Sequence, residues 1–110
     1  MANAPKTLHI SYRKDYPSPS SSFPSTLTTL NVNNVGLTSI DVRWFYLKAL
    51  RRLDISRNSV GHIRKSTTWQ KFCTIGRLEN LEVLILSGNR FNGFPVNSYI
   101  FIGIAFIYCN

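Results

Sequence analysis

Acidic residues and cysteines are scarce in this chain, and no long apolar segment is present. Its 110 residues hold 5 Asp+Glu against 13 Lys+Arg, which gives a formal net charge of +8. Two cysteines are too few for the disulfide framework of a small secreted domain. The apolar run at residues 99–108 falls well short of the roughly 20 residues of a membrane-spanning helix, and no signal peptide is recognisable. These shortages favour a single intracellular domain and exclude a large multidomain enzyme.

One apolar pattern recurs along the chain in a constant register. The pattern LxxLxLxxNxLxxI occurs twice in full and once with valine in place of asparagine. The full copies consist of Leu50, Leu53, Ile55, Asn58, Val60 and Ile63 and of Leu81, Leu84, Leu86, Asn89, Phe91 and Phe94, and the variant copy of Leu27, Leu30, Val32, Val35, Leu37 and Ile40. This spacing is typical of leucine-rich repeats, whose LxL segment forms a short strand. The sequence therefore predicts an α/β leucine-rich repeat solenoid of about three repeats, with a short parallel sheet on its concave face.

The asparagine of each full copy has an expected structural role. Asn58 and Asn89 follow the LxL strand at the same distance, where the chain turns away from the sheet. A buried amide side chain at this point satisfies backbone groups that the turn leaves unpaired. We expect the two asparagines to form a ladder between successive repeats.

The segments outside the repeats suggest how the two ends are organised. Leu8, Ile10 and Tyr12 alternate with polar residues, which predicts an N-terminal strand that covers the edge of the first repeat. The C-terminal tail is almost entirely apolar, so we expect an incomplete C-terminal end to the solenoid. The tail could also be a fourth repeat that is cut off at its strand. The expected units are an edge strand and linker at 1–24, repeats at 27–49, 50–80 and 81–95 within 25–95, and an apolar tail at 96–110.

The second repeat is longer than the first. Leu27 and Leu50 are 23 residues apart, whereas Leu50 and Leu81 are 31 apart, so eight extra residues fall within 64–73. Insertions in such repeats are usually surface loops on the convex side. The alternative is that Trp69 and Phe72 form a contact site there.

The repeat register brings a set of polar side chains to the concave face. Arginine forms bidentate contacts with carboxylates, so the arginines of this face are expected anchors for a protein partner. The alternative is that Arg51 pairs with Glu82 and Arg52 with Asp54, which leaves solvated pairs of little energetic consequence. The predicted protein-binding residues are Arg51, Arg52, Asp54, Arg57, Asn31, Asn33 and Glu82.

No arrangement of residues predicts catalysis, a metal or a cofactor. His9 and His62 lack an acidic partner at motif spacing, and Cys73 and Cys109 lack the spacing of a metal site. The remaining basic residues, Arg43 among them, spread over loops and the convex side. A basic nucleic-acid-binding domain is an alternative function, but the aromatic side chains that would stack on bases fall at core or return-segment positions. We therefore expect a non-enzymatic protein-binding module.

Part of the chain resembles one intracellular family of leucine-rich repeat proteins. The resemblance rests on the Arg-Lys-Asp-Tyr-Pro lead at 13–17, on Phe23-Pro24, and on residues 47–56. It implies a substrate-recognition subunit of a cullin-2 RING ubiquitin ligase that acts in the nucleus and cytoplasm, with the repeats binding the protein to be ubiquitinated. A generic repeat module of another pathway is the alternative. The elongin- and cullin-binding region of that family has no counterpart here, so we expect a fragment or truncated form, without a membrane partner.

Overall fold

The structure consists of short strands joined by long irregular segments. The computed structural model describes residues 4–60, 78–90 and 106–108. Its strands are β1 (Thr7–His9), β2 (Thr29–Asn31), β3 (Arg52–Asp54), β4 (Val83–Ile85) and β5 (Phe106–Tyr108), and its 3-10 helices are η1 (Arg13–Asp15) and η2 (Val42–Tyr46). Within these residues, no helix is long and apolar enough to cross a membrane.

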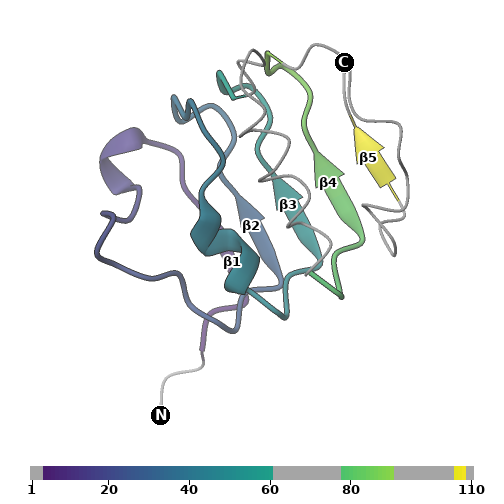
Figure 1. Ribbon diagram of the computed structural model, residues 1–110. Coiled ribbons are helices and arrows are strands. Elements are labelled where there is room, and N and C mark those ends of the chain that lie inside the picture. Colours follow the sequence, from purple (N-terminus) through teal and green to yellow (C-terminus); the bar gives the residue numbers. More distant parts are fainter. Residues whose placement is uncertain (1–3, 61–77, 91–105, 109–110) are drawn as a thin grey trace.

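The five strands form one parallel sheet in sequence order, as Figure 1 shows. Each strand pairs with its neighbour in the same register. One row of register partners consists of Leu8, Leu30, Leu53, Leu84 and Ile107. A parallel sheet whose strands follow one another in chain order is the arrangement of a repeat solenoid. The predicted leucine-rich repeat solenoid with a parallel sheet is confirmed.

The repeated apolar positions form the core. Alternate residues of a strand point to opposite faces, so the central residue of β2, β3 and β4 points inward while its neighbours point outward. Leu30, Leu53 and Leu84 are at most 1% exposed. The flanking core positions are equally buried, and they hold Leu27, Leu50, Leu81, Val32, Ile55 and Leu86. Each fully buried leucine contributes about 1.5–3 kcal/mol relative to an exposed one, so the repeats depend on this row.

Two asparagine side chains connect neighbouring repeats behind the sheet. Asn58 Oδ1 accepts hydrogen bonds from the backbone N–H groups of Val35 and Leu37, both at 3.0 Å. Its Nδ2 faces the carbonyl oxygens of Val32, Ile55 and Ser56 at 2.9–3.1 Å. Asn58 therefore serves backbone groups of two repeats at once.

Asn89 occupies the corresponding place one repeat later. Its Oδ1 accepts from Val60 N at 3.0 Å, and its Nδ2 donates to the carbonyl oxygens of Ile55 and Leu86 at 2.8 and 2.9 Å. The second and third repeats are thus joined by the same type of contact as the first and second.

The N-terminal segment adds an edge strand to the first repeat. β1 pairs with β2, and the Lys6 carbonyl accepts from the N–H groups of Thr28 and Thr29 at 2.8 and 3.1 Å. The predicted edge strand is confirmed. The expectation that Tyr12 continues its alternation is wrong, because Tyr12 is 64% exposed and precedes η1, where the chain has already turned away from the sheet.

Two predicted features fall wholly or partly outside the described residues. The insertion at 64–73, with Trp69 and Phe72, lies entirely outside them. Of the tail at 96–110, only β5 is described, and its register pairs Ile107 with Leu84. This pairing is the one that a fourth repeat requires.

Candidate protein-binding face

The outward-pointing residues of the strands and of the turns that follow them form one surface, here called the concave face. It changes from polar on β2 to apolar on β4. In the register, Thr29, Arg52 and Val83 form one row and Asn31, Asp54 and Ile85 the next. Val83 and Ile85 are partly exposed although they are apolar, and in the register they lie beside Arg52 and Asp54 of β3. A mixture of this kind is typical of surfaces that bind proteins.

Arg51 and Glu82 lie next to each other on adjacent repeats. Arg51 Nη2 donates to Glu82 Oε1 at 2.6 Å, and both side chains remain half exposed or more. The hydrogen bond and the charge of Glu82 raise the pKa of the Arg51 guanidinium. Because solvated pairs of this kind contribute little to stability, the contact mainly neutralises one arginine of the concave face.

Asp54 binds Ser56 instead of Arg52, the partner considered for it above. It is 7% exposed, and its Oδ1 accepts from Ser56 N at 2.9 Å and from Ser56 Oγ at 2.6 Å. The pairing of Arg52 with Asp54 is therefore not formed: the ion pairs among the described residues are Asp41–Arg43 and Arg51–Glu82. The physical reason is local, since an aspartate readily binds backbone two residues further on.

Asn31 repeats this arrangement one strand earlier. Its Oδ1 accepts from Asn33 N at 3.0 Å, as Asp54 does from Ser56 N. The polar residue at the end of each of these strands thus fixes the turn that follows. Asn31 and Asn33 are both partly exposed, so they remain on the concave face.

The turns after the strands place one residue of each repeat in the left-handed backbone region. These residues are Asn34 (φ 54°), Arg57 (φ 57°) and Gly88 (φ 72°), which share one register position. Glycine adopts this conformation freely and asparagine tolerates it, but it costs most other residues about 1–2 kcal/mol. Arg57 therefore carries backbone strain on an exposed part of the concave face.

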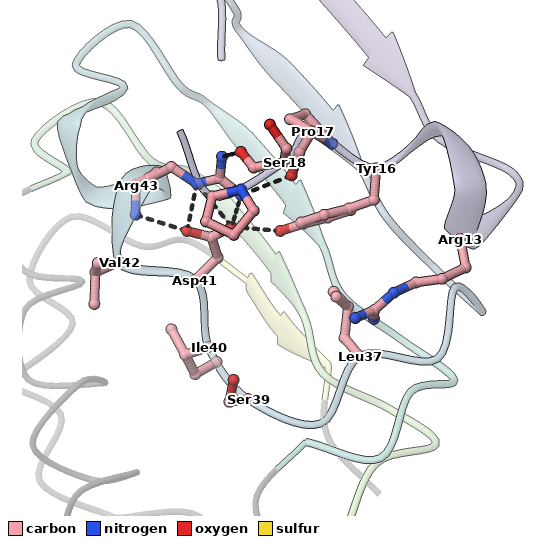
Figure 2. Close-up of a pocket in the computed structure, with 11 residues that line it drawn as sticks. Arg13, Tyr16, Pro17, Ser18, Leu37, Ser39, Ile40, Asp41, Val42 and Arg43 are labelled. Atoms are coloured by element: carbon pink, nitrogen blue, oxygen red, sulfur yellow. Dashed lines mark hydrogen bonds and ion pairs between the residues drawn. The ribbon is translucent and has the colours of Figure 1, made fainter. Parts of the chain in front are cut away.

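A second polar cluster lies where the N-terminal segment meets the first repeat. Figure 2 shows Tyr16, Asp41 and Arg43 pointing toward one another at a pocket of about 560 Å³. The Tyr16 hydroxyl donates to Asp41 Oδ2 at 2.7 Å, and Arg43 Nη2 lies 2.6 Å from the same oxygen. Asp41 also caps η2, because its Oδ1 accepts from Arg43 N at 2.9 Å. The cluster thus joins segments 25 residues apart.

Arg43 uses every N–H of its guanidinium in this cluster. Nη1 donates to the carbonyl oxygens of Ser18 and Ser21 at 2.6 and 3.0 Å, and Nη2 also donates to that of Pro17 at 3.2 Å. Nε lies 3.0 and 3.1 Å from the two oxygens of Asp41. Since a guanidinium has five N–H donors, none remains for a ligand in the pocket. The cluster holds the linker against the first repeat.

The electrostatics of the cluster agree with this structural role. Burial and the hydrogen bond to Asp41 raise the pKa of the Tyr16 hydroxyl well above its ordinary value. Burial alone would raise the pKa of Asp41, but the hydrogen bonds from Arg43 and Tyr16 outweigh it and hold this pKa below its ordinary value. Tyr16 is therefore protonated and Asp41 ionised over a wide pH range.

No catalytic arrangement emerges from the described part of the chain. Within it, no group of three or more His, Cys, Asp or Glu side chains could hold a metal ion. His62, Cys73 and Cys109 lie outside the described residues, and His9 is exposed on β1. The cluster around Asp41 was not anticipated from the sequence. The Tyr-Pro lead and an aspartate two residues before an arginine were its only sequence signals.

Comparison with known proteins agrees with the repeat architecture. A leucine rich repeat family model matches residues 25–70, and a second matches residues 80–99. Leucine-rich repeat protein 1 of Homo sapiens is 40% identical over 87 residues, which are 79% of this chain and 19% of the human protein. Its Mus musculus counterpart is 34% identical over 87 residues, which are 79% of this chain and 18% of that protein. The chain thus spans about a fifth of the length of these relatives.

Two solved structures share the fold at low sequence identity. An internalin C2 from Listeria monocytogenes superposes with a TM-score of 0.59 and 15% identity, covering 78% of this chain and 33% of its own. An internalin (inlF) from the same organism gives a TM-score of 0.54 and 22% identity, covering 77% of this chain and 22% of its own. Together with the sequence matches, the parallel sheet and the repeat register establish that the chain belongs to the leucine-rich repeat proteins, as a protein-interaction domain homologous to Leucine-rich repeat protein 1.

Proposed function

We propose that the concave face binds a protein substrate of a cullin-2 RING ubiquitin ligase. The observation that carries this proposal is the row of partly exposed apolar side chains, Val83 and Ile85, beside the polar and basic residues of β3. Burying such a row against a partner is favourable, and the surrounding polar side chains give the contact its specificity. Homology to Leucine-rich repeat protein 1 supports the same role.

The proposed role is recognition and not chemistry. A solenoid presents an extended concave surface to which a segment of another protein can bind. Ubiquitin transfer then belongs to the ligase, and contacts with elongin and cullin-2 are left to parts of such proteins other than these repeats. We place this activity in the nucleus and cytoplasm, without a cofactor.

Photo-crosslinking in nuclear extract tests the proposal. A benzoylphenylalanine at Val83 of the 110-residue chain should form protein adducts that an excess of the unlabelled chain suppresses. The same probe at Tyr46, which is exposed on η2 away from the sheet, is the matched control and should not form these adducts. The excess chain should also lower cullin-2-dependent ubiquitination of the crosslinked proteins, because it occupies them without delivering them to the ligase.

The outcomes separate three interpretations. Identical adducts from Val83 and Tyr46 would contradict binding on the concave face. Saturable adducts at Val83 whose ubiquitination does not depend on cullin-2 would support an interaction module of another pathway. Adducts that consist of nucleic acid and disappear steeply with added salt would support the nucleic-acid alternative.

A further inference from the structure

Arg57 occupies a backbone conformation that the other repeats assign to asparagine or glycine. Its φ of 57° matches Asn34 at 54° and Gly88 at 72°. The first two turns also share a hydrogen bond to the next repeat, because the N–H of Asn34 donates to Ser56 O and that of Arg57 to Ser87 O, at 3.0 and 2.9 Å. A strained residue that the fold tolerates at an exposed position points to a function for its side chain.

The neighbouring repeat leaves room for the Arg57 side chain. A Cβ added to Gly88 would lie 3.1 Å from Arg57 N and 3.3 Å from Arg57 Cγ. Both distances are shorter than ordinary van der Waals contact, so the glycine permits the close approach of the arginine. The stem of Arg57 therefore lies close to the backbone of Gly88.

No Asp or Glu side chain, all of which lie in the described part of the chain, forms an ion pair with Arg57 or Arg52. All five acidic residues lie within the described residues, so each can be traced. Asp41 pairs with Arg43, Glu82 pairs with Arg51, and the remaining three, Asp15, Asp54 and Glu79, form no ion pair in the described structure. Arg52 and Arg57 are both exposed. The concave face thus carries two cations without an ionic partner, at the two ends of one repeat strand and its turn.

We propose that Arg52 and Arg57 bind two carboxylates of an extended acidic segment of a protein partner that lies along β3. This inference rests on the proposed function and specifies the class of partner. Arg57 follows Arg52 by five positions, so their backbone positions are at most about 17 Å apart. Carboxylates up to about five positions apart in an extended segment fall within that span, and each can accept two parallel hydrogen bonds from a guanidinium.

The same surface argues against a nucleic acid as its ligand. Arg51 is already paired with Glu82, so the described strands and turns of this face leave two arginines, Arg52 and Arg57, for a chain of phosphates. The large aromatic side chains of the first repeat, Trp44 and Phe45, are buried in the core and cannot stack on bases. A protein segment, which brings a few carboxylates among apolar residues, fits both the charges and the apolar row on β4.

Selection from a random peptide library displayed on phage tests the inference. The immobilised 110-residue chain should enrich peptides with pairs of acidic residues up to about five positions apart. The variant Arg57→Asn keeps a residue that this turn accepts at position 34, so it should remain folded, and it should lose the acidic preference. For an enriched peptide, we expect Arg57→Asn to weaken binding roughly tenfold or more, because a charge-assisted bidentate contact is lost.

Controls make the result specific. Arg90→Asn removes the same charge from an exposed arginine that does not belong to the left-handed turn residues, and it should leave peptide binding unchanged. Asn34→Gly relaxes the same turn one repeat earlier without changing charge and should also leave it unchanged. Enriched peptides without acidic residues, unaltered binding by Arg57→Asn, or preference for an oligothymidylate over every peptide would each overturn the inference.

Competition between the enriched peptides and crosslinking from Val83 distinguishes failure of acid recognition from failure of the proposed function. Non-acidic peptides that still suppress crosslinking from Val83 would leave the concave face as a binding surface and overturn only acid recognition. If the enriched peptides do not compete at Val83, and no protein adduct forms there, both proposals are wrong.

Discussion

The Tyr16 hydroxyl donates a hydrogen bond to Asp41 Oδ2 at 2.7 Å, across 25 residues of sequence. This contact, together with the guanidinium of Arg43, fixes the linker against the first repeat. The Tyr16 ring also packs against Phe23, with ring centroids 5.8 Å apart in an edge-to-face arrangement. The edge strand β1 is therefore held at two places: by its pairing with β2 and by the polar cluster that follows it.

We expect Tyr16→Phe to lower the free energy of unfolding by about 1 kcal/mol. The ring contacts survive, but the hydroxyl is lost, and Oδ2 of the partly buried Asp41 keeps only the hydrogen bonds from Arg43. Urea denaturation at neutral pH measures the change. Tyr12→Phe is the control, because Tyr12 is 64% exposed and should shift the free energy by less than about 0.5 kcal/mol. Equal effects of the two substitutions would contradict a stabilising role for the cluster.

The lowered pKa of Asp41 predicts a loss of stability in acid. An unfolded aspartate has a pKa of about 3.9, and the folded pKa lies below it. The contribution of Asp41 is therefore present above about pH 4 and is lost as the pH falls through the folded pKa. Thermal unfolding from neutral pH to about pH 2 should show the difference between the parent chain and Asp41→Asn shrinking with falling pH.

A control separates this effect from general acid denaturation. Glu79→Gln removes a carboxylate that is exposed and forms no ion pair in the described structure. Its difference from the parent should stay small at every pH. If the Asp41→Asn difference were constant with pH, the hydrogen bonds from Arg43 would not stabilise the ionised form.

The repeat register was predictable because it rests on a period that the sequence repeats. Leu30, Leu53 and Leu84 share one position of the motif, and in the structure they share one row of the sheet. Local hydrogen bonds decide how exposed each side chain of the register is. Register alone makes Asp54 a surface residue, but Ser56 two residues later binds its carboxylate and it becomes nearly buried.

The cluster around Asp41 could not be predicted from the repeat pattern. Its members come from the linker and from η2, and no periodic pattern relates them. The left-handed turn lies between these cases. Asn34 and Gly88 occupy one register position, and both residue types tolerate the left-handed backbone region. A comparison of the repeats could therefore have predicted a left-handed, strained backbone at Arg57.

Asn58→Ala should destabilise the chain by about 2–4 kcal/mol. The substitution leaves the N–H groups of Val35 and Leu37 without their acceptor in a buried position, and each unsatisfied group costs about 1–3 kcal/mol. Circular dichroism with urea denaturation measures the loss. Asn80→Ala removes a single exposed contact, from Nδ2 to Lys48 O at 2.9 Å, and should cost less than about 1 kcal/mol. Similar losses for both variants would argue against the bridging role of Asn58.

Gly88→Ala should be more destabilising than Gly36→Ala, although both glycines have positive φ. Gly36 has φ 76° and open space around the added Cβ, so its substitution carries backbone strain of about 1 kcal/mol. At Gly88 the same backbone strain is present, and in addition the new Cβ would lie 3.1 Å from Arg57 N. The Arg57 backbone cannot move away without lengthening its hydrogen bond to Ser87 O.

Urea denaturation of both variants, each made in the parent chain and in Arg57→Gly, separates the two effects. The extra cost at Gly88 should decrease when residue 57 can adjust its backbone, whereas the cost at Gly36 should not change. An extra cost that persists in Arg57→Gly would mean that the close approach to residue 57 is not its source.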